Sequence, residues 1–442
     1  MAVSVIDLQL ERFAYGGDAI GRDETGRAVF VPFAQPGERV RARIVEEKRG
    51  FARAELLEVL TASPERIEPK CRHFPTPSPV PGPTADAAIL GDGLVGASGC
   101  GGCHYQHLTY EAQLRAKREI LRDQLQRIGR IEDPPVREAV PSPAEWNYRN
   151  HIQFHLTADG KLGFVAHSAL APATPGAERL LPITECHLPE APINALWPQL
   201  EFEPGSPISR AGIRLGDEED LMLVLESDSP QPPDLEIEAG ISAVHLFEED
   251  TLILAGDDHV TIRVLERAFR VSAGSFFQVN TAMAGKMVEH LLSHLPVSPA
   301  THLLDVYCGV GLFSAFFAPR VATVTGIESA PSACGDFAAN LDEFENVALY
   351  EAAAEDALPY LDLRPEVILL DPPRAGLDRR VLDAVLALRP ASIAYVSCDP
   401  STLARDAARL ISGGYRLTDV TPFDLFPQTY HIESISIFER KD

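Results

Sequence analysis

The sequence predicts a multidomain α/β protein in which two β-rich domains precede a C-terminal doubly wound α/β domain. Three patterns along the chain predict this fold class. Short alternating runs broken by glycines fill the first 60 residues, β-like runs separated by Pro, Gly and Asp follow from about residue 145, and apolar strand-like runs alternate with helical segments from about residue 261. A length of 442 residues is also too great for one ordinary core. We expect domains over residues 1–62, 63–260 and 261–442.

The first domain is expected to be a small OB-like β-barrel. Its opening stretch, VSVIDLQLERFAYGG, alternates apolar and polar residues, and glycines then separate about five short strands. Barrels of this type are common platforms for nucleic acids. Residues 37–53 contain six basic and three acidic residues, which permits a contact with RNA. A solvated strand face explains the same residues equally well.

The charge of the chain is unevenly distributed. The formal net charge is −25, but residues 151–260 hold 4 Lys and Arg against 20 Asp and Glu, whereas residues 1–150 hold 20 against 21. The acidity therefore lies mainly in the central domain, and it does not exclude an RNA partner. No run of about 18 apolar residues is present, and no basic lead precedes an apolar segment at the N-terminus. We expect a cytoplasmic monomer with no membrane contact.

The central domain, 63–260, contains a cysteine set that suggests a metal centre. The seven cysteines are an odd number, which argues against a disulfide framework and for metal binding or catalysis. Four of them are candidate ligands: Cys71, Cys100, Cys103 and Cys186. Their spacing leaves open a zinc ion or a [4Fe–4S] cluster. A Pro/Gly-rich loop separates the first two, and one long amphipathic helix is predicted over 107–130.

The C-terminal domain begins with a predicted nucleotide-cofactor site. In LLDVYCGVGLFS (303–314) a strand ends near Asp305, and Gly309 and Gly311 allow the backbone to approach a ligand closely. The next strand ends at Glu328, where a carboxylate can accept hydrogen bonds from ribose hydroxyls. The third glycine of the dinucleotide fingerprint is missing, so the pattern fits S-adenosylmethionine better than NAD. An ordinary turn with surface acids is the alternative.

Two further strand ends carry reactive side chains. VILLDPPRAGL places Asp371 where two prolines stop a strand, an element that presents planar nitrogenous bases to the cofactor methyl in several methyltransferase classes. YVSCDPSTLARD places Cys398 at the end of another strand, where substrates meet a parallel sheet. The alternatives are a strand terminator for Asp371 and an inert core thiol for Cys398.

Together these motifs resemble those of a known family. LLDVYCGVGLFS, DPPRAG, VSCDPSTLARD and HIES (431–434) follow GSFFQVN (274–280) in the order found in RNA 5-methyluridine methyltransferases. The sequence is most similar to the branch that modifies 23S ribosomal RNA and carries an N-terminal TRAM domain and an iron–sulfur cluster. The resemblance covers nearly the whole chain. It implies a TRAM-like RNA-binding barrel and a Rossmann-like class I methyltransferase domain.

The resemblance implies roles for individual residues. Cys398 corresponds to the nucleophile and Glu433 to the proton acceptor, while His431 orients the site or is structural. Gln278, Tyr307, Glu328 and Asp371 match positions that hold S-adenosylmethionine, and with Asp305, Gly309 and Gly311 they form the expected cofactor-binding set. The four candidate cysteines match the ligands of a [4Fe–4S] cluster, whereas Cys308 and Cys334 have no expected ligand role.

The chain departs from the family in the spacing of its first two cluster cysteines. The family spacing is short, but 28 residues separate Cys71 from Cys100 here. Lengthening a loop costs roughly 0.6 kcal/mol per doubling, so we expect an insertion that loops out from an intact site.

The chemistry of uracil explains why these residue types are needed. Its C5 is a poor nucleophile, and addition of a thiolate to C6 makes C5 able to take a methyl group; a base then removes the C5 proton and the thiol is eliminated. The target uridine must leave its stack to reach both groups, so unpaired RNA is expected as the partner. Arg374 and Arg405 are candidate RNA contacts.

Three other interpretations are considered. A methyltransferase acting on adenine, guanine or a protein amide would not need Cys398 and would leave HIES unexplained. A non-catalytic RNA-binding assembly factor would need neither the thiol, the carboxylate nor the cofactor positions. A transfer RNA uridine methyltransferase would share the whole architecture; we expect 23S ribosomal RNA because a TRAM domain with four cysteines fits it better.

Overall fold

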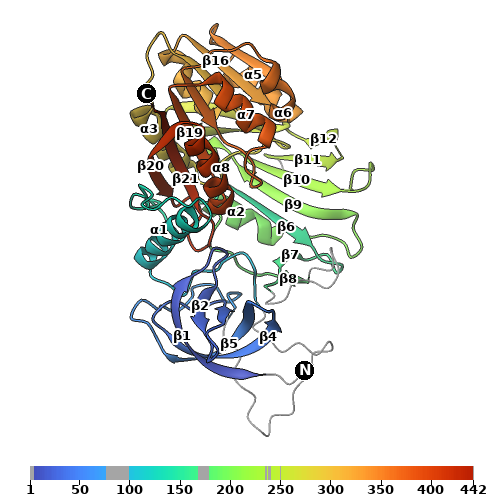
Figure 1. Cartoon of the computed structure of the whole chain (residues 1–442). Coiled ribbons are helices and arrows are strands. Elements are labelled where there is room, and N and C mark those ends of the chain that lie inside the picture. The colour runs from blue at the N-terminus through green and yellow to red at the C-terminus, as the bar shows by residue number, and fades with distance from the viewer. Residues whose placement is uncertain are drawn as a thin grey trace.

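The computed structural model describes residues 4–75, 99–167, 179–233, 236, 240–248 and 250–441. In Figure 1 a barrel, a central sheet and a C-terminal α/β domain follow one another along the chain. The predicted loop between Cys71 and Cys100 lies outside the described residues from 76 to 98. None of the helices in these ranges is long and apolar enough to cross a membrane.

The N-terminal domain is a closed five-stranded barrel, as predicted. Its strands are β1 (Val5–Phe13), β2 (Ala19–Arg22), β3 (Ala28–Val31), β4 (Arg39–Glu47) and β5 (Phe51–Thr61), in the order β1-β2-β3-β5-β4. β1 has the predicted alternation of side chains: Leu8 and Leu10 are buried in the barrel core, whereas Asp7 and Gln9 face outward. Closure leaves the barrel without free edges.

The basic residues of β4 lie on the outer face of the barrel and are paired with acids. Arg41 forms ion pairs with Asp7 at 3.0 Å and with Glu58 at 2.9 Å, and Arg43 pairs with Glu55. For Arg41 and Arg43, these pairs fit a solvated strand face better than an RNA contact.

The predicted long helix is α1 (Tyr110–Arg127), which starts three residues later and ends three residues earlier than expected. It packs on α8 and β20 of the C-terminal domain, as Figure 1 shows. Its buried stripe of Ala116, Ile120 and Leu121 follows the period of an amphipathic helix. The helix therefore joins the central region to the C-terminal sheet.

The central domain is built on a seven-stranded sheet in the order β12-β11-β10-β9-β6-β7-β8. Its strands are β6 (His151–Leu156), β7 (Leu162–Val165), β8 (Leu180–Pro182), β9 (Ile208–Leu215), β10 (Leu221–Ser227), β11 (Ile241–Phe247) and β12 (Asp250–Ala255). All pairings are antiparallel except β10 with β11. The short helix α2 (Ala191–Leu196) and the 3-10 turn Trp197–Gln199 cover its core, where Trp197 packs on Phe154.

A hairpin and a helix connect this sheet to the C-terminal domain. The hairpin is β13 (His259–Val264) with β14 (Arg267–Ser272), and the helix is α3 (Thr281–His294). The side chain of Asn280 caps α3 by accepting a hydrogen bond from the backbone N–H of Met283 at 3.2 Å. GSFFQVN is the loop that ends at this cap.

The C-terminal domain has a seven-stranded sheet in the order β17-β16-β15-β18-β19-β21-β20. Its strands are β15 (His302–Val306), β16 (Thr323–Glu328), β17 (Val347–Glu351), β18 (Val367–Leu370), β19 (Ser392–Ser397), β20 (Tyr415–Phe423) and β21 (Glu433–Arg440). Its helices are α4 (Leu312–Phe317), α5 (Pro331–Asn340), α6 (Ala354–Ala357), α7 (Arg379–Leu388) and α8 (Pro400–Ser412). The first five strands in this order are parallel and β21 is antiparallel to both neighbours. Apolar clusters cover both faces, which confirms the predicted doubly wound domain.

A buried ion pair fixes α1 to the C-terminal domain. Lys117 Nζ donates to Asp424 Oδ1 at 2.5 Å and to the Phe426 carbonyl at 3.0 Å, and both charged side chains are almost fully buried. Burial lowers the pKa of Lys117, and Asp424 opposes that shift. The two charges depend on each other because neither has access to water.

We expect Lys117→Met to lower the free energy of unfolding by about 3–5 kcal/mol, because it leaves the Asp424 carboxylate buried without a cation. Chemical denaturation followed by circular dichroism measures the loss. Arg127→Met, which removes the exposed pair with Asp123, is the matched control and should cost less than about 1 kcal/mol. The double variant Lys117→Met with Asp424→Leu should recover much of the lost free energy. Equal losses for Lys117→Met and Arg127→Met would contradict the assignment.

Candidate active site

The carboxyl ends of four neighbouring parallel strands bring most of the predicted site residues to one edge of the C-terminal sheet. β15 leads into Tyr307, β16 ends at Glu328, β18 leads into Asp371, and β19 leads into Cys398. Ligands of doubly wound sheets bind at this edge. These four residues, which are far apart in the sequence, therefore lie at the same edge of the sheet.

The turn after β15 has a backbone that favours glycine. Tyr307, Gly309 and Gly311 have φ values of 67°, 53° and 89°. A Cβ on Gly311 would also lie 2.4 Å from Leu341 Cδ1, so no other residue fits there without displacing α5 packing. The turn thus holds its backbone amides in one arrangement.

Glu328 is held by backbone amides beside this turn. Its Oε2 accepts from Gly309 N at 2.9 Å, and its Oε1 accepts from Ser329 N at 2.7 Å and Ala330 N at 2.8 Å. Three backbone donors fix the orientation of the carboxylate without occupying all of its lone pairs. Free acceptor positions remain for hydroxyl groups of a ligand.

Asp305 and Asp371 lie deeper than the sequence suggested. Asp305 is fully buried, and its Oδ2 accepts from Ser314 Oγ at 2.6 Å while its Oδ1 has no partner among the described residues. Burial raises the pKa of Asp305 to about 7. The pKa of Asp371 also rises to about 7, through burial and then through the charges of Asp305 and Glu328. The charges of these three carboxyl groups therefore act on one another, and a bound cation would relieve their repulsion.

Gln278 lies in the loop before α3, and no hydrogen bond among the described residues joins it to the three carboxyl groups. Its side chain is buried, and its backbone carbonyl accepts a hydrogen bond from Asn150 Nδ2 at 3.0 Å. Asn150 also donates to Thr281 Oγ1 at 2.9 Å, so one central-domain amide fixes both ends of the turn into α3.

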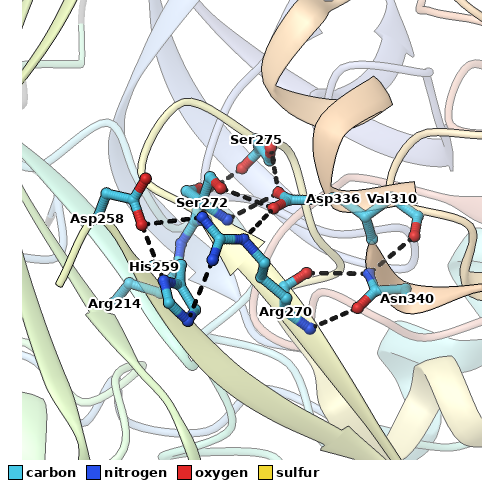
Figure 2. A network of polar contacts seen from close by, with 9 residues as sticks. All are labelled: Arg214, Asp258, His259, Arg270, Ser272, Ser275, Val310, Asp336 and Asn340. Atoms are coloured by element: carbon cyan, nitrogen blue, oxygen red, sulfur yellow. Dashed lines mark hydrogen bonds and ion pairs between the residues drawn. The ribbon is translucent and has the colours of Figure 1, made fainter. Parts of the chain in front are cut away.

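Figure 2 shows the polar network that supports the same loop from below, with Asp336 of α5 near its centre. The buried Asp336 carboxylate accepts from the hydroxyl groups of Ser272 and Ser275, both at 2.6 Å. Asn340, one turn further along α5, donates to the Val310 carbonyl in the glycine turn at 3.0 Å. The network therefore joins the loop of Gln278 to the turn of Gly309 and Gly311. No motif in the sequence marks it.

Cys398 and Glu433 lie close together where an antiparallel strand pair ends. Ser397, the last residue of β19, is paired with Ser434 of β21, and Cys398 and Glu433 are the next residues in the chain on either side of this pair. The charge of Glu433 acts on the Cys398 thiol, which places the two side chains near each other. Glu433 is buried, with 4% of its surface exposed, and Cys398 is partly buried. The two residues, 35 positions apart, are thus brought together by strand register.

The environment favours the protonated form of both groups. Burial raises the pKa of the Cys398 thiol to about 12, and the charges of Glu433 and Asp371 add to the shift. Burial and Asp371 likewise raise the pKa of Glu433 well above its usual range. Arg374 opposes both shifts, which places its guanidinium near the pair. The resting thiol is therefore neutral, and the carboxyl group binds a proton readily.

The barrel contributes a residue that the sequence did not reveal. Tyr15 Oη donates to Asp399 Oδ2 at 3.1 Å, and Asp399 directly follows Cys398. Asp399 Oδ1 caps α8 by accepting from the backbone N–H groups of Ser401 and Thr402 at 2.9 and 3.0 Å. The Asp399 carboxylate thus caps the start of α8 and accepts a hydrogen bond from a hydroxyl group of the N-terminal domain.

The two predicted RNA-contact arginines differ in their surroundings. Arg374 is exposed beside the Cys398 and Glu433 pair. Arg405 instead donates to Asp406 Oδ1 at 2.8 Å and to the Ala375 carbonyl at 3.0 Å, so it supports the DPPRAG turn.

The four candidate ligand cysteines converge on one cavity of about 310 Å³ in the central domain. All four side chains are partly buried, and burial raises the pKa of each thiol, to about 11 for Cys100 and about 12 for Cys186. If ionised, the thiolates would also repel one another. Among the described residues, no group of three or more His, Cys, Asp or Glu is placed to hold a single metal ion.

Known proteins match the whole chain. Residues 1–57 match the TRAM domain, and residues 249–441 match the family described as tRNA (Uracil-5-)-methyltransferase. An uncharacterized RNA methyltransferase of Thermosynechococcus vestitus is 31% identical over 98% of both chains, and one of Streptomyces coelicolor is 32% identical over 98% of this chain and 92% of its own. The chain belongs to the RNA uracil-5-methyltransferase family.

A solved structure of the family shares the fold. The tRNA (uracil-54, C5)-methyltransferase of Pyrococcus abyssi, solved in complex with S-adenosyl-L-homocysteine, superposes with a TM-score of 0.70. The two chains are 22% identical, and the match covers 98% of this chain and all of the other. The predicted family, a TRAM domain followed by an S-adenosylmethionine-dependent RNA methyltransferase, is confirmed for this member.

We expect Cys398 to react slowly with iodoacetamide near neutral pH, because its raised pKa keeps it protonated. Labelling of the Cys398 peptide, followed by mass spectrometry, should show a rate that rises only well above the ordinary thiol pKa of about 8.5. In urea the same peptide should show the ordinary midpoint.

Removing the neighbouring carboxylate tests the cause of that shift. Glu433→Gln should lower the labelling midpoint of Cys398, whereas Glu439→Gln at the exposed end of β21 should not. A folded-state midpoint equal to that in urea would contradict the assigned environment.

Proposed function

We propose that this family member methylates C5 of a uridine in 23S ribosomal RNA through a covalent bond between Cys398 and C6 of the uracil. The observation that carries the proposal is the register of β19 and β21, which brings the ends of these strands together and so supports a thiol at Cys398 close to the carboxyl groups of Glu433 and Asp371. A nucleophile and a base beside the residues that hold a methyl donor are what this reaction requires.

The proposed steps use the two groups in turn. Cys398 Sγ adds to C6 while the thiol proton passes to water, and the electron pair of the C5=C6 bond moves to C5 and O4. S-adenosylmethionine, when bound, would supply the methyl group that C5 takes up. Glu433, in its carboxylate form at this stage, removes the C5 proton; the C5=C6 bond re-forms as the C6–S bond breaks, and the Cys398 thiolate takes that proton from Glu433. A carboxylate with a raised pKa is a stronger base once its own proton has left.

The carboxyl-rich edge of the sheet suits a sulfonium nucleoside. We propose that Glu328 accepts the ribose hydroxyls and that Gln278, Tyr307 and Asp371 hold the rest of the cofactor. Gly309 and Gly311 would let the turn approach it, and Asp305 would support that turn from within the sheet. Burial is the main reason for the raised pKa of Asp371, and the charges of Asp305 and Glu328 add to it; a positively charged sulfonium would compensate those charges.

We further propose that Cys71, Cys100, Cys103 and Cys186 hold a [4Fe–4S] cluster. The convergence of all four thiols on one cavity of about 310 Å³ supports an inorganic group that four cysteines hold together. When bound, it would link three separate segments of the central domain.

The proposal includes a division of the chain and a choice of RNA. We place the domain boundaries at residues 1–62, 63–260 and 261–442. The four-cysteine set with a TRAM domain supports 23S ribosomal RNA, while the family description supports transfer RNA as the second candidate. Mapping 5-methyluridine in both RNA classes from a deletion strain decides between them, because only the true substrate loses its methyl group.

We expect RNA containing 5-fluorouridine to form an adduct with this protein that survives denaturing gels, because fluorine at C5 prevents the final proton removal. S-adenosylmethionine must be present. Cys398→Ala should abolish the adduct, and Ser412→Ala at the exposed end of α8 should retain it. An adduct in Cys398→Ala would contradict the mechanism.

Glu433→Gln should trap unmodified RNA in the same way, because the methylated intermediate keeps its C5 proton. The expected result is a covalent complex that accumulates with ordinary uridine and a turnover rate lower by about a hundredfold or more. Rapid turnover in this variant would exclude Glu433 as the base.

We expect protein purified without oxygen to be brown and to contain iron and sulfide. Cys186→Ser should reduce the iron content and the thermal midpoint, while Cys308→Ser should leave the iron content unchanged. Stoichiometric zinc without iron would refute the cluster.

A further inference from the structure

A second cavity, of about 230 Å³, lies between the barrel and the central domain and has no part in the chemistry above. We call it the barrel pocket. Its side chains come from the β1–β2 turn, β3 and β5 of the barrel and from two segments of the central domain. They include Tyr15, Asp18, Phe30, Arg53, His104 and His167.

Two histidines of the barrel pocket have ring nitrogens without partners. Nδ1 of His104 and Nε2 of His167 are buried and make no hydrogen bond within the described parts of the chain. Buried polar atoms of this kind are rare and indicate a missing ligand or water. Burial also lowers the pKa of His167 to about 4, so this ring is neutral at physiological pH. A neutral imidazole suits the uncharged edge of a nucleobase better than a phosphate.

The barrel side of the pocket combines an aromatic ring with a cation. The guanidinium carbon of Arg53 lies 6.0 Å from the centroid of the Phe30 ring, and Arg53 also forms an ion pair with Asp18 at 3.5 Å. About half of the Arg53 side chain is exposed, so it can meet a phosphate at the mouth. Aromatic faces and arginine planes are the surfaces on which proteins stack unpaired RNA bases.

The pocket is connected directly to the catalytic loop. Tyr15 lines it and donates its hydroxyl to Asp399, the residue after Cys398. A base in this pocket therefore lies close to a uridine held at Cys398. We propose that the barrel pocket binds a second unpaired base of the substrate RNA while the target uridine occupies the site at Cys398. The inference rests on the proposed function, since it requires RNA at Cys398.

The test uses the full-length protein trapped on RNA that contains 5-fluorouridine, with either ribosomal or transfer RNA as the probe. Ultraviolet irradiation of the trapped complex and mass spectrometry of its digest identify residues that contact other nucleotides. We expect a second nucleotide crosslinked to the peptides of Tyr15, Phe30 or His167. An adduct whose crosslinks all lie elsewhere overturns this inference alone, whereas the absence of any adduct overturns it together with the proposed function.

Variants give an independent measurement. Phe30→Ala and Arg53→Gln should each slow adduct formation by about tenfold at limiting RNA, with unchanged affinity for S-adenosylmethionine in calorimetry. Arg41→Gln, on the outer face of the same barrel, is the matched control and should react at the normal rate. Arg53 is about half exposed, so Arg53→Gln should keep the wild-type thermal midpoint even where Phe30→Ala lowers it. Equal rates for Arg53→Gln and Arg41→Gln overturn the proposal.

Discussion

The insertion of β21 between β19 and β20 is the constraint on which the site depends. β21 is antiparallel to both neighbours, so its first residue meets the ends of β19 and β20. A shift by one residue would turn Glu433 to the other face of the sheet. The side chains of β21 are buried from Glu433 to Phe438, and this apolar packing specifies the register. The geometry of the two reactive groups is therefore a product of core packing.

The loop between β20 and β21 links this register to the rest of the molecule. Gln428, with a φ of 71°, exchanges two hydrogen bonds with Gln113 of α1, and its carbonyl accepts from the backbone N–H groups of His104 and Tyr105. These two residues directly follow Cys103. The path from the cysteine cavity to the strand that carries Glu433 thus consists of backbone and amide hydrogen bonds with little freedom to move. Lys117 strengthens the same junction through Asp424.

Structural features that depend on local sequence patterns could be predicted, whereas contacts between distant segments could not. Alternation in β1, the glycine turn after β15 and the strand ends at Asp371 and Cys398 follow from side-chain period and backbone preference, and the structure has them. The hydrogen bond from Tyr15 to Asp399 spans 384 positions, and no periodicity encodes it. Arg405 illustrates the same limit: its type suggested RNA, but a neighbouring Asp406 and the turn it supports engage its guanidinium. Asp336 was missed because a buried carboxylate within a helix has no signature in sequence.

The contact between Tyr15 and Asp399 has a consequence for how interchangeable the domains are. An RNA-binding barrel attached by a linker could be replaced by any other barrel of similar affinity, and only the choice of RNA would change. Here the barrel hydroxyl touches the carboxylate that begins α8, one residue from the thiol. A foreign barrel lacking that tyrosine would bring RNA to the protein and still disturb the loop that holds Cys398. The barrel is thus part of the catalytic architecture, and the two domains are constrained to change together.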